Sequence, residues 1–234
     1  MLAFRKESKK MVRLMLCLPS TGDWKADFGI SLTQMCVYMS STLFEHAEER
    51  EIVVNDKRTS MIATSREECL QDAVARECTH ALFIDCDQAF PPDTAHQLMR
   101  WRKPVVAANI AVKAIPSFPN SRAKGPTPFG VPVTTDPWKR GLEQVWRVGT
   151  GIMLIDCAIL PKLGHGLFGS PWIAEVGRYQ GEDWTFCQKC EEAGIPIFVD
   201  HDLSRSVTHV GNFAYGHQHI PLIENAPAAM EKAA

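Results

Sequence analysis

The sequence predicts a single α/β domain in which helices cover both faces of a mostly parallel sheet. Short apolar runs alternate with segments of helical periodicity over residues 12–110, the usual pattern of parallel strands joined by helical crossovers. A chain of 234 residues can also bury one full core, and it shows no internal repeat or boundary. We therefore expect one domain over residues 1–234, with its core at 11–220.

The elements follow in order from the spacing of apolar residues. In the first half we expect strand 12–18, helix 28–44, strand 51–54, helix 65–77, strand 81–84, helix 92–101 and strand 104–110. The helix at 65–77 has Thr64 or Ser65 as its cap, with Glu68 at capping-box distance. In the second half we expect strand 146–156, a helix at 181–193 ended by Gly194, and strand 195–199. Residues 113–138 form a long proline-rich loop, and residues 221–234 a frayed tail.

Composition narrows the class of protein. The formal net charge is −2, which gives no overall attraction to nucleic acid or anionic membranes. No apolar run reaches the roughly 18 to 20 residues that span a bilayer, and no signal peptide is recognisable. The eight cysteines lie mostly in apolar stretches, as reduced thiols of a cytoplasmic protein do. Cys187 and Cys190 form a lone C-x-x-C, which fits one face of a helix better than a zinc site.

Two carboxylates directly follow a buried strand. Asp85 and Asp87 end the apolar run 81–84, and Pro91 and Pro92 then stop regular structure. Open α/β sheets bind ligands at this edge, and two hard oxygen donors suit Mg²⁺ or Mn²⁺ beside a diphosphate. The alternative is that one aspartate caps the next helix and the other is solvated.

Two later clusters add polar groups. Glu182 and Asp183 begin a predicted helix, where they either favour its N-terminus or act on an acceptor hydroxyl as general base. His209 follows a strand-like stretch and precedes Gly211. It is either an ordinary polar residue or the group that completes the coordination of a cation held by Asp87.

In this order, the motifs resemble those of the GT-A glycosyltransferases, in particular the small single-domain type related to glycosyltransferase family two that is common in phages and bacteria. The resemblance covers residues 60–212, and its carriers are 79–87 with 90–93, 105–109, 148–155, 181–187 with 192–199, and 209–211. It implies a GT-A (Rossmann-like) domain that uses a nucleoside-diphosphate sugar, with UDP as the expected nucleotide, and Mn²⁺ or Mg²⁺.

The resemblance also implies roles for single residues. Those facing the donor would be Arg66, Asp85, Asn109 and Gly151; those holding the metal would be Asp87, His209 and Asp85; the catalytic acids would be Asp183, as base, and Glu182. One departure is that Ala108-Asn109 and Lys113 stand where family members often have a glycine-rich or basic pair.

The chemistry of transfer agrees with these residues. Negative charge develops on the leaving diphosphate, which a metal and a cation such as Arg66 stabilise, while a carboxylate takes the proton of the acceptor hydroxyl. Two alternatives stay open: a nucleotidyl- or phosphoryl-transferring enzyme, and a catalytically silent nucleotide-binding module. The first usually has a glycine-rich, lysine-bearing phosphate loop, and Gly22 stands nearly alone near the first strand.

The acceptor is left open by the sequence. Residues 113–138 interleave basic with aromatic residues, which suits either a lid over the donor or a surface for a phosphate backbone. The acceptor hydroxyl could belong to a small molecule, a protein, a surface polymer or hydroxymethylated bases of phage DNA, so DNA is one candidate partner. We expect the protein to work in the cytoplasm of a bacterial or phage-infected cell.

Overall fold

A seven-stranded sheet forms the centre of the structure, a computed structural model that describes residues 12–45, 50–211 and 214–220. The strand order is β2-β1-β3-β9-β5-β12-β8. These strands are β1 (Val12–Ser20), β2 (Arg50–Arg58), β3 (His80–Ile84), β5 (Val105–Ala107), β8 (Leu142–Val145), β9 (Ile152–Asp156) and β12 (Ile197–Asp200). Five of them run in one direction, and only β8 and β9 run against it. The expected mostly parallel sheet is confirmed.

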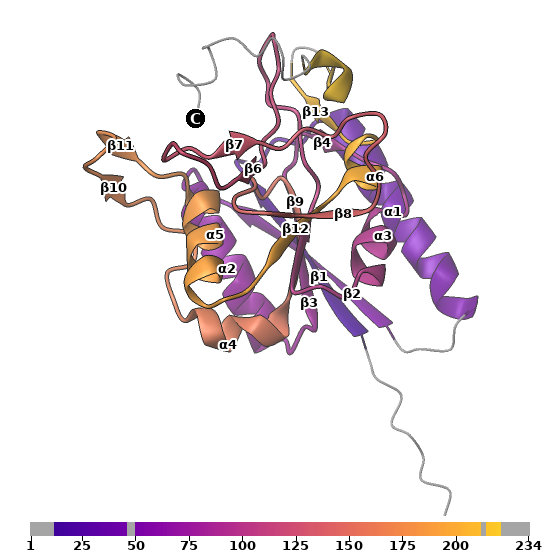
Figure 1. Cartoon of the computed structure of the whole chain (residues 1–234). Helices are drawn as coiled ribbons and strands as arrows, with labels where there is room; N and C mark the ends of the chain where they lie inside the picture. Colours follow the sequence, from indigo (N-terminus) through magenta and orange to yellow (C-terminus); the bar gives the residue numbers. More distant parts are fainter. Residues whose placement is uncertain (1–11, 46–49, 212–213, 221–234) are drawn as a thin grey trace, which may run out of the picture.

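Helices cover both faces of this sheet, as Figure 1 shows. One face carries α1 (Ala26–Glu45), α3 (Thr94–Arg100) and α6 (His201–Ser204), and the other carries α2 (Ile62–Ala75), α4 (Leu160–Leu163) and α5 (Glu182–Glu192). The strands divide their side chains between the two cores with a period of two. In β3, Ala81 and Phe83 pack on the side of α2 and α5, whereas Leu82 and Ile84 pack on the side of α1 and α3. The predicted fold class, an α/β domain with helices on both faces of a mostly parallel sheet, is therefore confirmed.

Two predicted elements were wrong in detail. The helix predicted at 65–77 begins at Ile62 after Met61, without a side-chain cap, because Ser65 Oγ donates instead to the carbonyl of Lys57 at 3.1 Å. The strand predicted at 146–156 covers only Ile152–Asp156 (β9), because residues 146–151 are irregular and the preceding strand β8 ends at Val145. The break between β8 and β9 contains Gly149 and Gly151.

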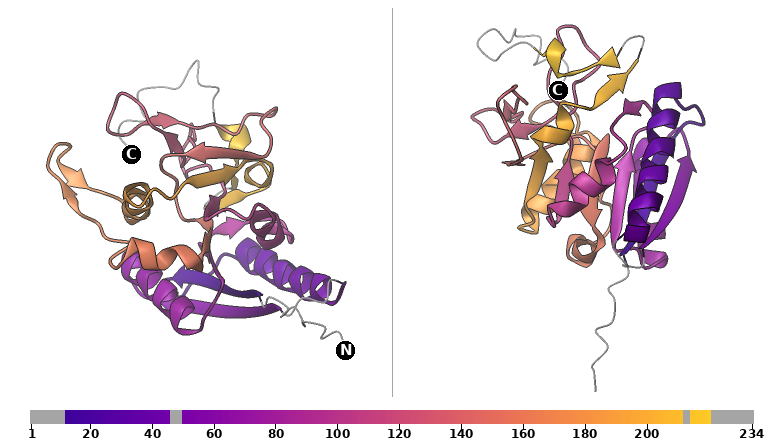
Figure 2. Two further views of the ribbon diagram at one scale, coloured as in Figure 1. Left: turned by 60° about the horizontal axis from the view of Figure 1, so that its bottom comes forward. Right: turned by 90° about the vertical axis from the view of Figure 1, so that its right-hand side faces the viewer.

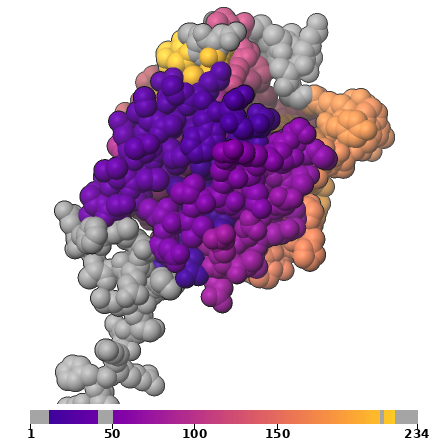
Figure 3. All heavy atoms as spheres, turned by 180° about the vertical axis from the view of Figure 1, so that it is seen from behind, coloured from indigo at the N-terminus to yellow at the C-terminus, as the bar shows by residue number. Residues whose placement is uncertain are grey.

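Short strands complete the structure around the sheet. The 113–138 loop contains the small pair β6 (Arg122–Ala123) and β7 (Val131–Pro132), and is otherwise irregular. The hairpin of β10 (Trp172–Ile173) and β11 (Arg178–Tyr179) projects from the body of the molecule, as the orange arm in Figures 2 and 3 shows. A third small sheet joins β4 (Gln88–Ala89), β13 (Thr208–Val210) and β14 (Ala214–Tyr215), followed by the short helix η2 (His217–His219); η1 (Cys157–Ile159) follows β9.

Two further expectations concern the chain as a whole. Among the described residues, no helix has the length and apolar character needed to cross a membrane. All eight cysteines are free thiols, and Cys187 and Cys190 are buried on one face of α5, as expected for a helix face. The tail predicted to fray, 221–234, lies outside the described residues.

Candidate active site

Asp85 and Asp87 lie at the carboxyl end of β3, in the middle of the sheet. The backbone nitrogen of Asp85 donates to the carbonyl of Gly151 at 2.9 Å, where β9 begins beside β3. A Cβ at position 151 would lie 2.8 Å from Ile110 Cδ1 and 3.4 Å from Asp85 Oδ2. Gly151 thus lets β9 approach Asp85 closely, at the edge where open α/β sheets bind ligands.

Arg66 connects two of the predicted acidic residues. It projects from α2, its side chain is only 5% exposed, and its Nη2 lies 2.9 and 3.2 Å from the two carboxylate oxygens of Asp85. Its Nη1 donates to Glu182 Oε1 at the start of α5. Arg66 Nε is buried without a hydrogen-bond partner. One arginine therefore fixes α2, the end of β3 and the start of α5 to one another.

Asp87 faces a separate pair of basic groups. Lys113 Nζ lies 2.5 Å from Asp87 Oδ2, and His209 Nε2 lies 3.4 Å from the same oxygen. The pairing of β13 with β4 sets His209 opposite Gln88, next to Asp87 in the chain. Burial alone would raise the pKa of Asp87, but His209 and Lys113 hold it well below its usual range.

The structure does not gather the predicted metal ligands Asp85, Asp87 and His209 into one three-residue cluster. Within the described parts of the chain, no three histidine, cysteine, aspartate or glutamate side chains gather so as to hold a metal ion. The physical reason is that Asp85 is paired with Arg66, which leaves Asp87 and His209 as the remaining donors.

The remaining donor pair still has the chemistry of a cation site. His209 Nδ1 lies 3.2 Å from the carbonyl oxygen of Ala111, which can only accept, so a neutral His209 presents its Nε2 lone pair toward Asp87. An imidazole nitrogen and a carboxylate oxygen facing each other suit Mn²⁺ or Mg²⁺ once the ammonium of Lys113 moves aside.

Asp183 is an acid whose pKa shifts in the opposite direction to that of Asp87. It stands in the first turn of α5 and accepts a hydrogen bond from the backbone nitrogen of Trp184 at 2.7 Å. Burial and the charge of Glu182 raise the pKa of Asp183 to about 6, although Arg66 acts in the opposite direction. A Cβ at Gly149 would lie 3.3 Å from Asp183 Oδ2, so the chain passes the carboxylate closely.

Asn109 does not join this group of residues. Its side chain is fully buried, and its Nδ2 donates to Val133 O at 2.7 Å and to Thr135 Oγ1 at 3.1 Å. Its Oδ1 accepts from the backbone nitrogen of Ser121. The structure thus uses the amide of Asn109, predicted to face the donor, to anchor the loop after β5.

A cavity of about 380 Å³ opens beside Asp183. Its walls include several aromatic and basic side chains, among them Phe118, Phe129, Trp146, Trp184, Arg122 and Arg147. Arg147 stood out in the sequence only as one of several basic residues near the 113–138 loop, and Trp146 did not stand out, because segments far apart in the chain build this wall. The signal that could have found Trp146 is its place next to Arg147, just after the basic and aromatic residues of this loop.

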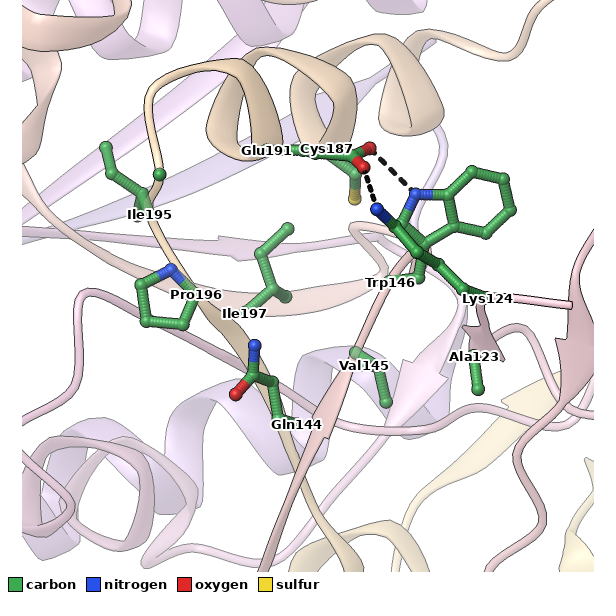
Figure 4. A pocket seen from close by; sticks show the side chains of 11 residues that line it. Ala123, Lys124, Gln144, Val145, Trp146, Cys187, Glu191, Ile195, Pro196 and Ile197 are labelled. Atoms are coloured by element: carbon green, nitrogen blue, oxygen red, sulfur yellow. Dashed lines mark hydrogen bonds and ion pairs between the residues drawn. The ribbon is translucent and has the colours of Figure 1, made fainter.

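A second cavity, of about 410 Å³, lies on the other side of Trp146, against the edge strand β8 (Figure 4). Here Glu191 accepts from Trp146 Nε1 at 2.7 Å and pairs with Lys124 Nζ at 2.5 Å. It also pairs with Arg147 Nη2 at 2.9 Å. Glu191 therefore holds Trp146 and Arg147 in place from α5, although no predicted site residue lines this second cavity.

Comparison with known proteins shows the fold rather than a family. No protein-family model matches the sequence, and no curated protein matches it. The crystal structure of A197 from STIV is similar with a TM-score of 0.56 and 16% identity, over 92% of this chain and 95% of that one. This likeness shows a shared fold over nearly the whole chain.

More distant likenesses are to Drosophila β1,4-galactosyltransferase 7. Its catalytic domain in complex with xylobiose gives a TM-score of 0.45 and 13% identity, over 95% of this chain and 79% of that one. A mutant in complex with manganese, UDP-Gal and xylobiose gives 0.43 and 14%, over 86% and 72%.

Proposed function

We propose that the protein transfers a sugar from a nucleoside-diphosphate sugar, with UDP as the nucleotide, to the hydroxyl of an acceptor. The observation that carries the proposal is that paired cations and acids lie at one part of the carboxyl edge of the sheet, while an acid with a raised pKa lies at another. Arg66 and Lys113 supply positive charge beside Asp85 and Asp87, while Asp183, the acid with the raised pKa, stands at the aromatic cavity.

The donor end suits the leaving group. A diphosphate that departs from a sugar gains negative charge, and fixed cations at that point stabilise the transition state more than the ground state. Asp87 and His209 would hold a divalent cation, Mn²⁺ or Mg²⁺, which supplies further positive charge when bound. Arg66 offsets one of the two negative charges of Asp85 and Glu182, so these acids repel the donor less than free carboxylates would.

Asp183 suits the role of base toward the acceptor. A carboxylate with a pKa of about 6 is a stronger base than an ordinary aspartate, yet it is still ionised at neutral pH. It lines the cavity that is large enough for one sugar ring or a base, whereas Asp85 and Asp87 are held by cations. Hydroxymethylated bases of DNA are one acceptor to include in the test.

The test is a comparison of UDP-sugar turnover with Mn²⁺ and with EDTA, with and without candidate acceptors. We expect release of UDP that needs the cation and falls in the Asp183→Asn variant. Asp202→Asn in α6 is the matched control, because that residue pairs with Arg140 and Arg205 away from the site. Binding of UDP without any turnover would instead identify a silent nucleotide-binding module.

A further inference from the structure

Arg122 is a buried cation without an anion. Its residue is 5% exposed and lines the cavity, and within the described residues no carboxylate forms an ion pair with its guanidinium. Its backbone is fixed between two strands, because Arg122 bridges Arg147 on one side and Pro132 of β7 on the other. Burial lowers the pKa of Arg122, because the guanidinium is partly removed from water.

The other cations around the cavity differ from Arg122. Arg147 is equally buried, but its Nη2 pairs with Glu191 at 2.9 Å. Arg178, from β11, is half-buried and lies over the ring of Phe129, 4.2 Å from its centroid. The single acid of the cavity wall is Asp183. A neutral ligand would leave the charge of Arg122 buried and unpaired, whereas an anionic group would pair with it.

We infer that the acceptor carries an anionic group, a phosphate or a carboxylate, and that Arg122 binds this group while Asp183 faces the acceptor hydroxyl. That the bound molecule is the acceptor rests on the proposed function. That the cavity binds an anion rests on the cavity alone. Trp146 and Trp184, whose ring centroids are 6.1 Å apart, form an aromatic wall that suits a ring bearing the anion.

The experiment uses three probes that share a phenyl ring, without any donor. Phenyl β-D-glucuronide and phenyl β-D-glucoside differ only in a carboxylate, and phenyl phosphate tests the other anion. Binding is followed by tryptophan fluorescence and calorimetry. We expect at least one anionic probe to bind about tenfold more tightly than the glucoside, which is the discrimination of one charge-assisted contact. Equal binding of all three probes would overturn the inference.

Two variants locate the effect. Arg122→Gln should remove the preference for the anion and leave glucoside binding unchanged, whereas Arg140→Gln, at a 62% exposed arginine outside the cavity, should keep it. A preference that survives Arg122→Gln, or that is lost instead in Lys113→Met at the donor end, would overturn the inference. If Arg122→Gln does not fold, Arg122→Lys replaces it and should retain the preference, because it retains the charge.

The two proposals can fail separately. Binding of the anionic probes through Arg122, with no sugar transfer under any condition, would overturn the proposed function but leave the anion site standing. Transfer to neutral acceptors, with no preference for the anionic probes, would overturn the anion site but leave the transferase standing.

Discussion

The ammonium of Lys113 lies 2.5 Å from Asp87 Oδ2, the same oxygen that faces His209. The lysine stem runs past Gly211, where an added Cβ would lie 3.4 Å from Lys113 Cδ. Lys113 thus reaches Asp87 from the start of the 113–138 loop over a position without a side chain. A divalent cation and this ammonium would compete for one carboxylate oxygen.

Replacing Lys113 should therefore strengthen metal binding. In Lys113→Met we expect about tenfold tighter binding of Mn²⁺ in the absence of nucleotide, because no ammonium has to leave Asp87. Electron paramagnetic resonance of free Mn²⁺ measures this affinity. Lys139→Met, which removes an ammonium from Glu143 instead, is the control and should leave the affinity unchanged. Equal or weaker binding in Lys113→Met would show that the cation does not share this oxygen.

Arg66 should matter for stability as well as for the donor. Arg66→Met leaves Asp85 and Glu182 side by side without their cation, and we expect a loss of about 3 kcal/mol in the free energy of unfolding. Urea denaturation measures the loss. Arg58→Met breaks a pair with Asp56 in which the arginine is 69% exposed, so it should cost less than about 1 kcal/mol. Similar values for the two variants would contradict the connecting role of Arg66.

The raised pKa of Asp183 predicts that the protein loses stability as the pH rises through the acidic range. Its pKa is near 3.8 in the unfolded chain and about 6 in the folded one, so folding favours its protonated form. The contribution of Asp183 to the free energy of unfolding is most favourable below pH 3.8. It falls as the pH rises from 3.8 to 6 and does not change further above pH 6. Asp183→Asn should then be more stable than the native chain at pH 7 by about 1 to 3 kcal/mol, and no more stable at pH 3.5. Thermal unfolding at the two pH values tests both parts.

The same substitution should lower turnover. If Asp183 is the base, kcat falls by about 10² to 10⁴ in Asp183→Asn while the affinity for UDP is nearly unchanged. In the native protein, kcat/KM should rise with pH up to about 6 and then level off, as the carboxylate ionises. A stable variant with native turnover would leave Asp183 as a residue of the helix terminus only. Loss of UDP binding would place it at the donor.

The sequence was informative where function depends on local pattern. Asp85 and Asp87 follow a buried strand, and the run of apolar residues before them identifies that strand and its end. The start of α5 at Glu182 and Asp183 was equally visible, because a glycine precedes the acids and a helical pattern follows. Such features need only neighbours in the chain.

Features that depend on distant parts of the chain could not be predicted in this way. Asn109 looked like a donor contact, but its amide is used by Val133 and Thr135, more than twenty residues further on. The pairing of Asp85 with Arg66 changed the expected metal site for the same reason. Arg122 looked like one basic residue of a loop, and only the folded structure shows that it is buried without an anion.

Gly151 offers the sharpest test of the packing around the aspartates. In Gly151→Ala the new Cβ would lie 2.8 Å from Ile110 Cδ1 and 3.5 Å from Gln88 Nε2, so Ile110 has to move. We expect a loss of about 1 to 3 kcal/mol in stability, the usual cost of overpacking a core, together with weaker binding of UDP because Asp85 is displaced.

The same chemical change at Gly29 should have the opposite sign. Gly29 lies within α1, where an added Cβ meets nothing within 4 Å, so Gly29→Ala should stabilise the protein by about 0.5 to 1 kcal/mol. Urea denaturation and calorimetry with UDP measure the two effects.

Adding Ile110→Ala to Gly151→Ala should restore UDP binding, since it removes the atom that the Cβ meets. Weak binding that persists in the double variant would mean that Gly151 acts through its backbone rather than through the space it leaves.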